Sequence, residues 1–471
     1  MPMIRALKDP TELRVISDDV LCSRVNGRLP RVNKGLHKTP SPIDDLDPGV
    51  DFALRPIDML LELGAATTPP LPDDLRLSAR WGLLRYGWAL AAPTMPLSPL
   101  HLSAYAMNVK YHRKMLQSED LGVGLACWLC GELLAARWPD ATLLRVDGEA
   151  ALDPAVRSLA VPSITKLPLA TTGKMPDYFW VAYDGPSATI HEVVVLECKG
   201  THTDDHVFTQ LADAMHQLEA VTVAGATAKS IAFGAMLNDR RVRVYGVDPE
   251  GSTLAGPVHS RTRRRSTLEA SIDEQGRLDI TDPPRFRRRL LDVGAAQMLN
   301  WAGLSQPAAA RLAGEPSADG VEEMALSVRE TDAGVFVGVS SRLPVSSAKS
   351  YDVFFGLDRE VAHALVADDE QAEGAAFADV RSRTAPWQER TAERLATALE
   401  NTASPGDAPE ERLPEEFPRD PPQRERRVGR RHLALDDAED PNVVQAATPE
   451  GLFIEVRAYE GGATHATALS G

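Results

Sequence analysis

Two opposite charges stand two residues apart at the end of an otherwise apolar run. The run IHEVVVLECKG ends in Glu197, Cys198, Lys199 and Gly200. Side chains alternate between the two faces of a strand, so Glu197 and Lys199 point to one face and Cys198 points to the other. The apolar residues explain a buried strand, but a lone buried carboxylate or ammonium would be costly. The charged pair therefore requires a partner.

An acidic partner stands twenty residues before Glu197. Asp177 follows Pro176 and opens a second strand-like run, DYFWVAYDG, so it could lie next to Glu197. Two adjacent carboxylates repel each other, and a divalent cation that prefers oxygen ligands, Mg²⁺ or Mn²⁺, resolves this repulsion. Such an ion lowers the pKa of a bound water and stabilises charge on a phosphoryl oxygen. Lys199 could then orient the attacking water or balance charge in the transition state.

The elements that must position these residues lie within residues 118–250. We expect the first helix to begin at a Ser118 cap and to end before Pro139. The following helix is closed by Gly225. The expected elements are, in order, the helix SEDLGVGLACWLCGELLAARW, the strands ATLLRVDG, DYFWVAYDG and IHEVVVLECKG, the helix HVFTQLADAMHQLEAVTVAG, and the strands KSIAFGAMLN and RRVRVYGVDP. This order predicts an α/β fold, a mixed sheet flanked by helices.

A Pro-Asp dipeptide ending at Asp177, followed by the tripeptide Glu197–Lys199, resembles the motif of the PD-(D/E)xK nuclease superfamily, which has the restriction-endonuclease-like fold. The core of that family is a helix, then strands, then a helix and further strands, and residues 118–250 are similar in order and spacing. The resemblance implies metal-dependent hydrolysis of phosphodiester bonds. It implies Asp177 and Glu197 as ligands of Mg²⁺ or Mn²⁺ and Lys199 as the catalytic lysine.

Two further residues follow from the same resemblance. The family often places an acidic residue on its first core helix, and Glu119 is the predicted residue here, with Glu132 as the alternative. Some members carry a glutamine on the helix that follows the strand with the lysine. Gln217 is the predicted residue at that place, with Gln210 as the alternative.

Composition excludes several other classes of protein. The chain has 471 residues, of which 43% are hydrophobic and 25% charged, as in soluble globular proteins. It has no run of eighteen apolar residues that could span a membrane, and its N-terminus lacks the apolar core of a secretory signal. Four cysteines do not form a disulfide framework in a chain of this length. We therefore expect a cytoplasmic protein without a membrane partner.

The net charge of −16 is unevenly distributed. Residues 1–300 hold 34 Lys and Arg against 36 Asp and Glu, a net of −2, and residues 301–471 hold 17 against 31, a net of −14. A near-neutral region with local basic patches can still bind a phosphate backbone. Two arginine clusters could form such patches or a solvated basic surface, and the residues predicted to contact nucleic acid are Arg263, Arg264, Arg265, Arg287 and Arg288.

The chain divides into five predicted segments. The N-terminal segment contains helical patterns, among them DFALRPIDMLLELG, and the acidic C-terminal region has α+β character, with a hairpin in EMALSVRETDAGVFVGVSSRLP. A proline-rich charged stretch follows, which we interpret as a linker or disordered segment. The segments are 1–109 (partly helical), 110–255 (nuclease-like core), 256–401 (α+β region of unknown role), 402–442 (linker) and 443–471 (strand and tail).

Simpler interpretations of single residues stay open. Glu197 and Lys199 could form a salt bridge at a strand end, and Asp177 could be a turn residue. Cys127 and Cys130 lie within an apolar helix without a second CxxC, which favours core thiols over zinc ligands.

Our main hypothesis is a metal-dependent nuclease that acts on DNA rather than RNA. A homodimer or a partner protein of a multi-component system is expected beside the nucleic acid. The Ala-, Arg- and Pro-rich composition indicates a GC-rich bacterium, in which such nucleases often serve antiviral defence. The alternative is a non-catalytic scaffold or binding module in a larger complex.

Overall fold

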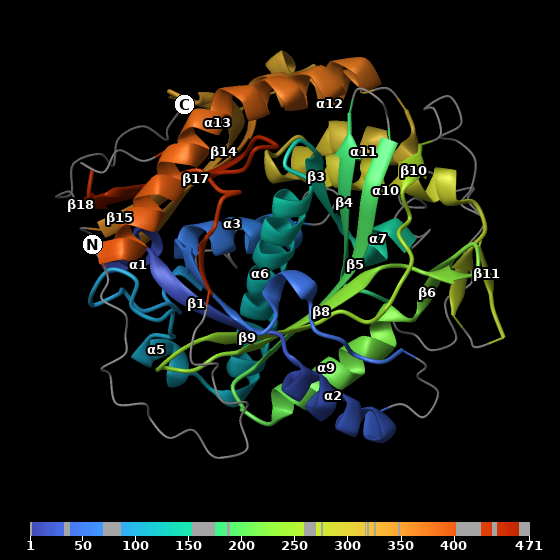
Figure 1. The fold of residues 1–471 in the computed structure, drawn as a ribbon. Coiled ribbons are helices and arrows are strands. Elements are labelled where there is room, and N and C mark those ends of the chain that lie inside the picture. The colour runs from blue at the N-terminus through green and yellow to red at the C-terminus, as the bar shows by residue number, and fades with distance from the viewer. Residues whose placement is uncertain are drawn as a thin grey trace.

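A mixed sheet lies at the centre of the computed structural model, with helices on both of its faces (Figure 1). An antiparallel sheet and the long helix α13 (Glu370–Asn401) lie beside it. The structure describes residues 2–32, 38–68, 86–152, 175–185, 189–258, 270–274, 277–315, 317, 320–324, 326–346, 349–401, 425–435 and 440–460.

The central sheet joins strands from distant parts of the chain. Among the described residues it has nine strands, eight of them in the order β16-β2-β1-β9-β8-β5-β4-β3, with β10 paired to β5. The pairs β5/β8, β1/β9 and β16/β2 are parallel and the others are antiparallel. The strands are β1 (Thr11–Ile16), β2 (Val50–Leu54), β3 (Thr142–Asp147), β4 (Tyr178–Asp184), β5 (Thr189–Thr201), β8 (Ser230–Met236), β9 (Arg243–Val247), β10 (Gly256–Pro257) and β16 (Glu425–Val428).

Helices α6 (Tyr111–Arg137) and α9 (His206–Leu218) cover opposite faces of β5. A Cβ on Gly200 would lie against the backbone of Ser118 in α6, so this residue faces α6. Gly234 stands opposite Lys199 in the β5/β8 pair, and a Cβ there would lie 2.8 Å from Val207 of α9. Because alternate residues face opposite sides, Lys199 is on the α9 side of the sheet.

Two smaller sheets complete the described strands. The antiparallel sheet has the order β13-β14-β15-β18-β17, and the other sheet has the order β11-β12-β6-β7. Their strands are β6 (Val221–Val223), β7 (Ala226–Thr227), β11 (Ala270–Ile272), β12 (Leu278–Ile280), β13 (Ser327–Thr331), β14 (Gly334–Ser346), β15 (Lys349–Asp358), β17 (Val443–Ala447) and β18 (Leu452–Glu460).

The remaining helices pack around these sheets. Helix α3 packs against α6, and α10 packs against β3 and α11. These helices are α1 (Pro2–Lys8), α2 (Asp19–Val32), α3 (Pro56–Ala66), α5 (Ala104–Met107), α7 (Gly148–Leu152), α10 (Pro283–Trp301), α11 (Ser305–Ala313) and α12 (Arg359–Ala367), with short 3₁₀ turns at Asp44–Leu46 and Val321–Glu323. Across the described ranges, the structure contains no helix that combines the length and the hydropathy of a membrane span.

The expected α/β class and its mixed sheet are confirmed, whereas several element boundaries were wrong. Helix α6 begins at Tyr111, seven residues before the predicted Ser118 cap, whose hydroxyl instead bonds the Met115 carbonyl inside the helix. Helix α9 ends at Leu218, because the β-branched residues after it form β6. The predicted hairpin is present as β13 and β14.

The predicted segments do not correspond to separate sheets. Strands β1 and β2 of the N-terminal segment belong to the same sheet as β4 and β5, and β17 and β18 complete the sheet of β13–β15. Part of the predicted linker, 425–428, is strand β16, paired to β2. These pairings join residues hundreds of positions apart, which local sequence patterns do not reveal. Residues 402–424 and 436–439 of the predicted linker lie outside the described residues.

Candidate active site

The register of β4 and β5 brings the two predicted metal ligands together. Tyr178 pairs with Leu196, so the next step of the antiparallel ladder sets Asp177 opposite Glu197. The Asp177 amide donates to Glu197 Oε2 at 3.2 Å, and the Cys198 amide donates to Asp177 Oδ2 at 2.8 Å. The two carboxylates are thus held side by side by the backbone of each other's strand.

Lys199 adds the positive charge of the site. Its Nζ donates to Glu197 Oε1 at 2.5 Å and to Gln217 Oε1 at 2.8 Å. The Gln217 amide in turn donates to the Met175 carbonyl at 3.4 Å, just before Asp177. Glu197 is fully buried, whereas 19% of the Lys199 side chain is exposed, so the ammonium reaches the surface of the site.

One cation does not balance the two carboxylates. Burial, and then the neighbouring Asp177, raise the pKa of Glu197 well above its ordinary value. Burial also raises the pKa of Asp177, although Lys199 opposes the shift. Burial alone would lower the pKa of Lys199, but Glu197 and Asp177 outweigh it and raise that pKa. The arrangement is therefore short of positive charge when both carboxylates are ionised.

The donor set fits a hard divalent cation. Mg²⁺ in proteins is often bound by one or two carboxylates, while waters and substrate phosphate oxygens complete its octahedron. Asp177 and Glu197 supply such a pair, and a cation between them would remove their repulsion. The described part of the chain contains no cluster of three or more His, Cys, Asp or Glu side chains that could hold a metal.

Helix α6 lies directly against the strand that carries the site. A Cβ on Gly122 would lie 2.7 Å from the Lys199 carbonyl, so only glycine permits this contact between α6 and β5. One turn earlier, the backbone of Glu119 lies near Gly200, and its side chain is exposed. The structure places Glu119 beside the strand end, but it forms no hydrogen bond to Asp177, Glu197 or Lys199, and its role in the site stays a prediction.

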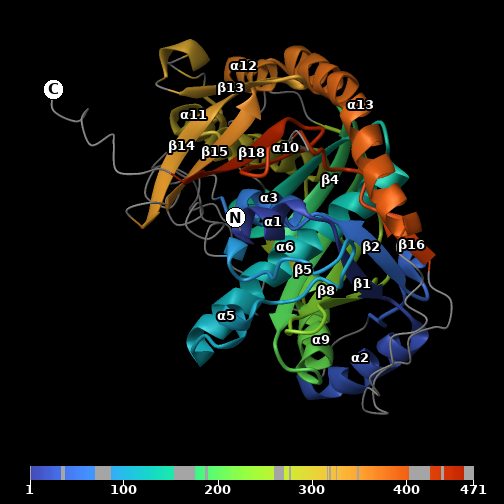
Figure 2. The same cartoon turned by 90° about the vertical axis from the view of Figure 1, so that its left-hand side faces the viewer.

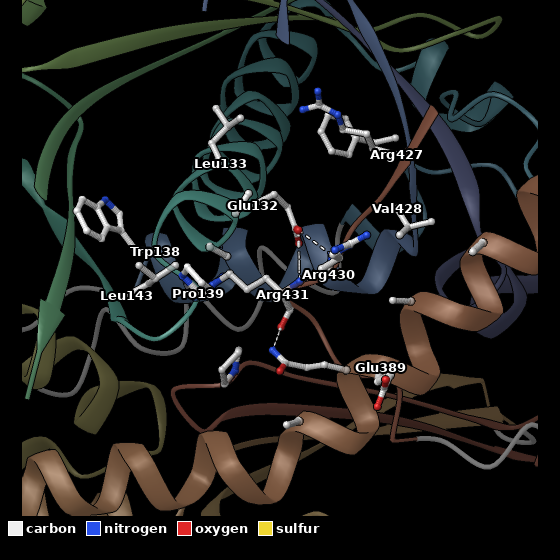
Figure 3. Close-up of a pocket in the computed structure, with 18 of the residues that line it drawn as sticks. Glu132, Leu133, Trp138, Pro139, Leu143, Glu389, Arg427, Val428, Arg430 and Arg431 are labelled. Atoms are coloured by element: carbon white, nitrogen blue, oxygen red, sulfur yellow. Dashed lines mark hydrogen bonds between the residues drawn. The ribbon is translucent and has the colours of Figure 1, made fainter. Parts of the chain in front are cut away.

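The alternative acidic residue, Glu132, belongs to a different part of the protein. Its carboxylate accepts hydrogen bonds from the amides of Arg430 and Arg431, at 2.7 and 3.1 Å (Figure 3). These contacts lie at a cavity of about 1260 Å³ between α13 and the C-terminal half of α6, which none of the proposed site residues lines. Glu132 anchors the chain after β16 and is not a member of the site.

The two candidate glutamines both lie on α9, but only one contacts the lysine. Gln217 bonds Lys199 directly, as described above. Gln210 donates instead to the Gly200 carbonyl at 3.3 Å and so stabilises the end of β5. The geometry thus selects Gln217 over Gln210 as the partner of the lysine.

The predicted phosphate-binding arginines do not form the expected surface. Arg287 is 8% exposed and donates to the carbonyls of Leu254, Ala255 and Pro257. Arg288 is 5% exposed and forms an ion pair with Glu370. Both side chains are buried and hold α10 in place, so the structure does not show them as part of an exposed basic surface, and their contact with nucleic acid stays a prediction. The others, Arg263, Arg264 and Arg265, lie outside the described residues.

One acidic residue near the site was missed. Asp147 ends β3, and the adjacent Gly148 amide donates to the Asp177 carbonyl at 2.9 Å. Burial raises the pKa of Asp147 to about 6, and the charges of Glu149 and Asp177 add to this shift. The sequence signal that could have identified Asp147 is an acidic residue followed by a glycine at the end of a predicted strand.

The cysteines occupy the core. Cys127, Cys130 and Cys198 are all buried and free, so the interpretation of the CxxC pair as core thiols is confirmed. Cys198 points away from Glu197 and Lys199, towards Cys127 on α6, as the alternation of a strand requires.

Comparisons of the chain with protein-family models, with curated proteins and with solved structures found no match. The likeness to the nuclease superfamily therefore consists of a motif and an order of elements. The motif is Asp177 before β4 and Glu197 to Lys199 in β5, and its members meet in space.

Proposed function

We propose that the protein is a metal-dependent nuclease that hydrolyses phosphodiester bonds, with DNA as its first substrate to test. The observation that carries this proposal is the meeting of Asp177, Glu197 and Lys199 at neighbouring positions of β4 and β5. A same-face salt bridge would need only Glu197 and Lys199. The second carboxylate, that of the half-buried Asp177, raises the cost of ionising Glu197, and a cation bound between the two would remove that cost.

Each residue has a role that its position allows. Asp177 and Glu197 would hold Mg²⁺ or Mn²⁺, which supplies Lewis-acid stabilisation of a phosphoryl oxygen and a water of lowered pKa. Lys199, partly exposed beside them, would bind the attacking water or a phosphoryl oxygen as charge develops. Gln217 would position the lysine through its hydrogen bond to Nζ.

The order of elements around the site supports the finer fold assignment. Helix α6, strands β3, β4 and β5, helix α9 and strand β8 come in the order of the restriction-endonuclease-like core, with the short elements α7, β6 and β7 between them. The additional strands β1, β2, β9 and β16 would then extend that core.

A cleavage assay tests the proposal. Plasmid DNA, single-stranded DNA and RNA are each incubated with the protein in Mg²⁺, Mn²⁺ or EDTA. Lys199→Ala should abolish metal-dependent cutting. Lys229→Ala is the matched control, because Lys229 also pairs with a carboxylate of β5, that of Glu192 at 3.1 Å, and should leave cutting unchanged.

Two outcomes would contradict the assignment. Cutting by Lys199→Ala at the normal rate would show that this lysine is not catalytic. If the wild type cuts no substrate and calorimetry detects no Mn²⁺ binding that depends on Asp177, a non-catalytic scaffold becomes the better description.

A further inference from the structure

One stretch of this acidic chain has no acidic residue at all. Between Asp74 and Glu119 the sequence holds six Lys and Arg and no Asp or Glu. Its charge of +6 contrasts with −16 for the whole chain. Three of the six cations, Lys110, Arg113 and Lys114, lie in the described part of the chain. A local group of positive charges attracts polyanions even when the net charge of the protein is negative.

The same stretch exposes large apolar side chains. Ten such side chains are exposed among the described residues, and six of them belong to this one stretch. Soluble proteins rarely expose apolar groups together unless the surface binds something. The six are Trp88, Met95, Tyr105, Tyr111, Met115 and Leu116.

Helices α5 and α6 present cations and aromatic rings together. Tyr105 is 69% exposed and Tyr111 is 79% exposed, so both rings are open to solvent. Met115 lies one turn after Tyr111 on the same side of α6, and the cations lie between and beside them. We call Tyr105, Lys110, Tyr111, Arg113, Lys114 and Met115 the α5–α6 surface.

This surface adjoins the end of the strand that carries the proposed site. The Leu102 amide, just before α5, donates to the Asn238 carbonyl after β8, and the Leu237 amide donates to the Thr201 carbonyl of β5. Figure 2 shows α5 projecting from the body of the molecule near α9 and the ends of these strands. Burial lowers the pKa of His202, and the charge of the nearby Lys114 acts in the same direction. His202 follows Lys199 by three residues, roughly 10 Å along an extended chain.

We infer that the α5–α6 surface binds a single strand of nucleic acid and leads it to the site around Lys199. This inference rests on the proposed nuclease function. Cations on the surface would contact phosphates, and the exposed tyrosine rings would stack on bases. Bases of a duplex are already stacked on one another, so open rings of this kind favour an unpaired strand.

Binding without cleavage tests the inference. Fluorescence anisotropy in EDTA measures the affinity of the full chain for a labelled single strand and for a blunt duplex of the same sequence. An oligonucleotide of roughly 20 nucleotides exceeds the about 4–16 nucleotides that one single-strand-binding module covers. We expect the single strand to bind more tightly than the duplex.

Matched variants assign the binding to the surface. Tyr111→Ala should weaken single-strand binding at least about fivefold, since one stacked base contributes that much. The pair Lys110→Glu and Arg113→Glu should reduce the salt slope by about 1.4, because each phosphate contact on a single strand contributes about 0.7. Acidic residues suit the start of a helix, so this pair should fold normally.

The control variants carry the same types of substitution at exposed positions outside the α5–α6 surface. Tyr459→Ala removes a tyrosine that is 40% exposed, and Arg342→Glu with Arg359→Glu reverses two exposed charges. Both should bind as the wild type does. Circular dichroism confirms that every variant is folded.

Equal binding of the duplex and the single strand would overturn the inference, and so would wild-type affinity in the surface variants. A third contrary result would be that the protein is a dimer which Tyr111→Ala dissociates while the affinity for nucleic acid stays the same, because the surface would then be a dimer interface. The cleavage assay separates the two proposals. If the variants lose binding but the wild type cuts no substrate, the binding surface is supported and the proposed nuclease activity is contradicted. If the wild type and the variants cut at the same normal rate, the nuclease activity is supported and the proposed role of the surface is contradicted.

Discussion

The ammonium of Lys199 is held at 2.8 Å from the side-chain oxygen of Gln217, the penultimate residue of α9. Through the same amide, Gln217 also contacts the carbonyl of Met175, just before Asp177. One glutamine therefore links helix α9, strand β5 and the segment that enters β4. This link sets where the lysine stands relative to the two carboxylates.

Gln217→Ala should lower the rate of cleavage by roughly ten- to a hundredfold, the usual effect of losing a residue that orients a functional group. Because Gln217 would not touch substrate, kcat should fall while KM stays nearly constant. Gln210→Ala is the control on the same helix, since Gln210 bonds the Gly200 carbonyl and not the lysine. Equal rates for the two variants would contradict the positioning role.

Asp177→Asn should abolish cleavage and raise the thermal stability of the metal-free protein at neutral pH. Burial raises the pKa of Asp177, so its ionised form opposes folding above its ordinary pKa. A neutral asparagine removes this cost, and its carbonyl oxygen can still accept the hydrogen bond from Cys198. Unfolding midpoints in EDTA measure the difference.

Mn²⁺ should stabilise the wild type and not Asp177→Asn. A ligand that binds only the folded state adds about 2.7 kcal/mol when its free concentration is 100 times Kd. The same unfolding experiment, repeated with Mn²⁺, measures this effect. Equal metal-dependent shifts in both proteins would show that Asp177 is not a ligand.

Arg431→Ala should destabilise the protein by roughly 3–5 kcal/mol, the cost of breaking a buried ion pair from one side. The guanidinium of Arg431 is buried between Glu62 and Glu450, and contacts the latter at 2.9 Å. Arg427→Ala, in the same segment, removes a more exposed pair with Glu425 and should cost about 0–1 kcal/mol. Urea unfolding of both variants tests the contrast.

The free energy of unfolding should fall as pH rises from 6.5 towards 9, because His432 loses its proton over this range. Burial favours the neutral imidazole, but the neighbouring carboxylates of Glu132 and Glu62 outweigh it and raise the pKa of His432 to about 9. A raised histidine pKa stabilises the fold fully below its ordinary value of 6.5, and this contribution is lost as pH rises through 9. The loss is on the order of 3 kcal/mol. His432→Gln should remove this slope from a plot of unfolding free energy against pH.

Arg287→Ala should lower stability and leave nucleic-acid affinity unchanged. The substitution removes the hydrogen bonds that Arg287 donates to backbone carbonyls, among them those of Leu254 and Pro257. A buried carbonyl left without a hydrogen bond costs about 1–3 kcal/mol of stability. A loss of affinity in a folded Arg287→Ala protein would instead support the original prediction of a phosphate contact.

The sequence by itself determined the local elements and the motif. Alternation and apolar runs predicted strands at the places of β3, β4, β5, β8 and β9, because a strand buried in a sheet needs these residues. The spacing of Glu197 and Lys199 determined that they share one face, since a strand repeats every two residues.

Only the tertiary structure decided which distant residues meet. The register of β4 on β5 set Asp177 against Glu197, and the packing of α9 chose Gln217 over Gln210. Glu132 and Arg287 hold distant segments in place through hydrogen bonds. The sequence did not predict this role, because their partners lie hundreds of residues away for Glu132 and tens of residues away for Arg287. A sequence shows periodicity within an element, but hydrogen bonds between elements depend on how whole helices and strands pack together.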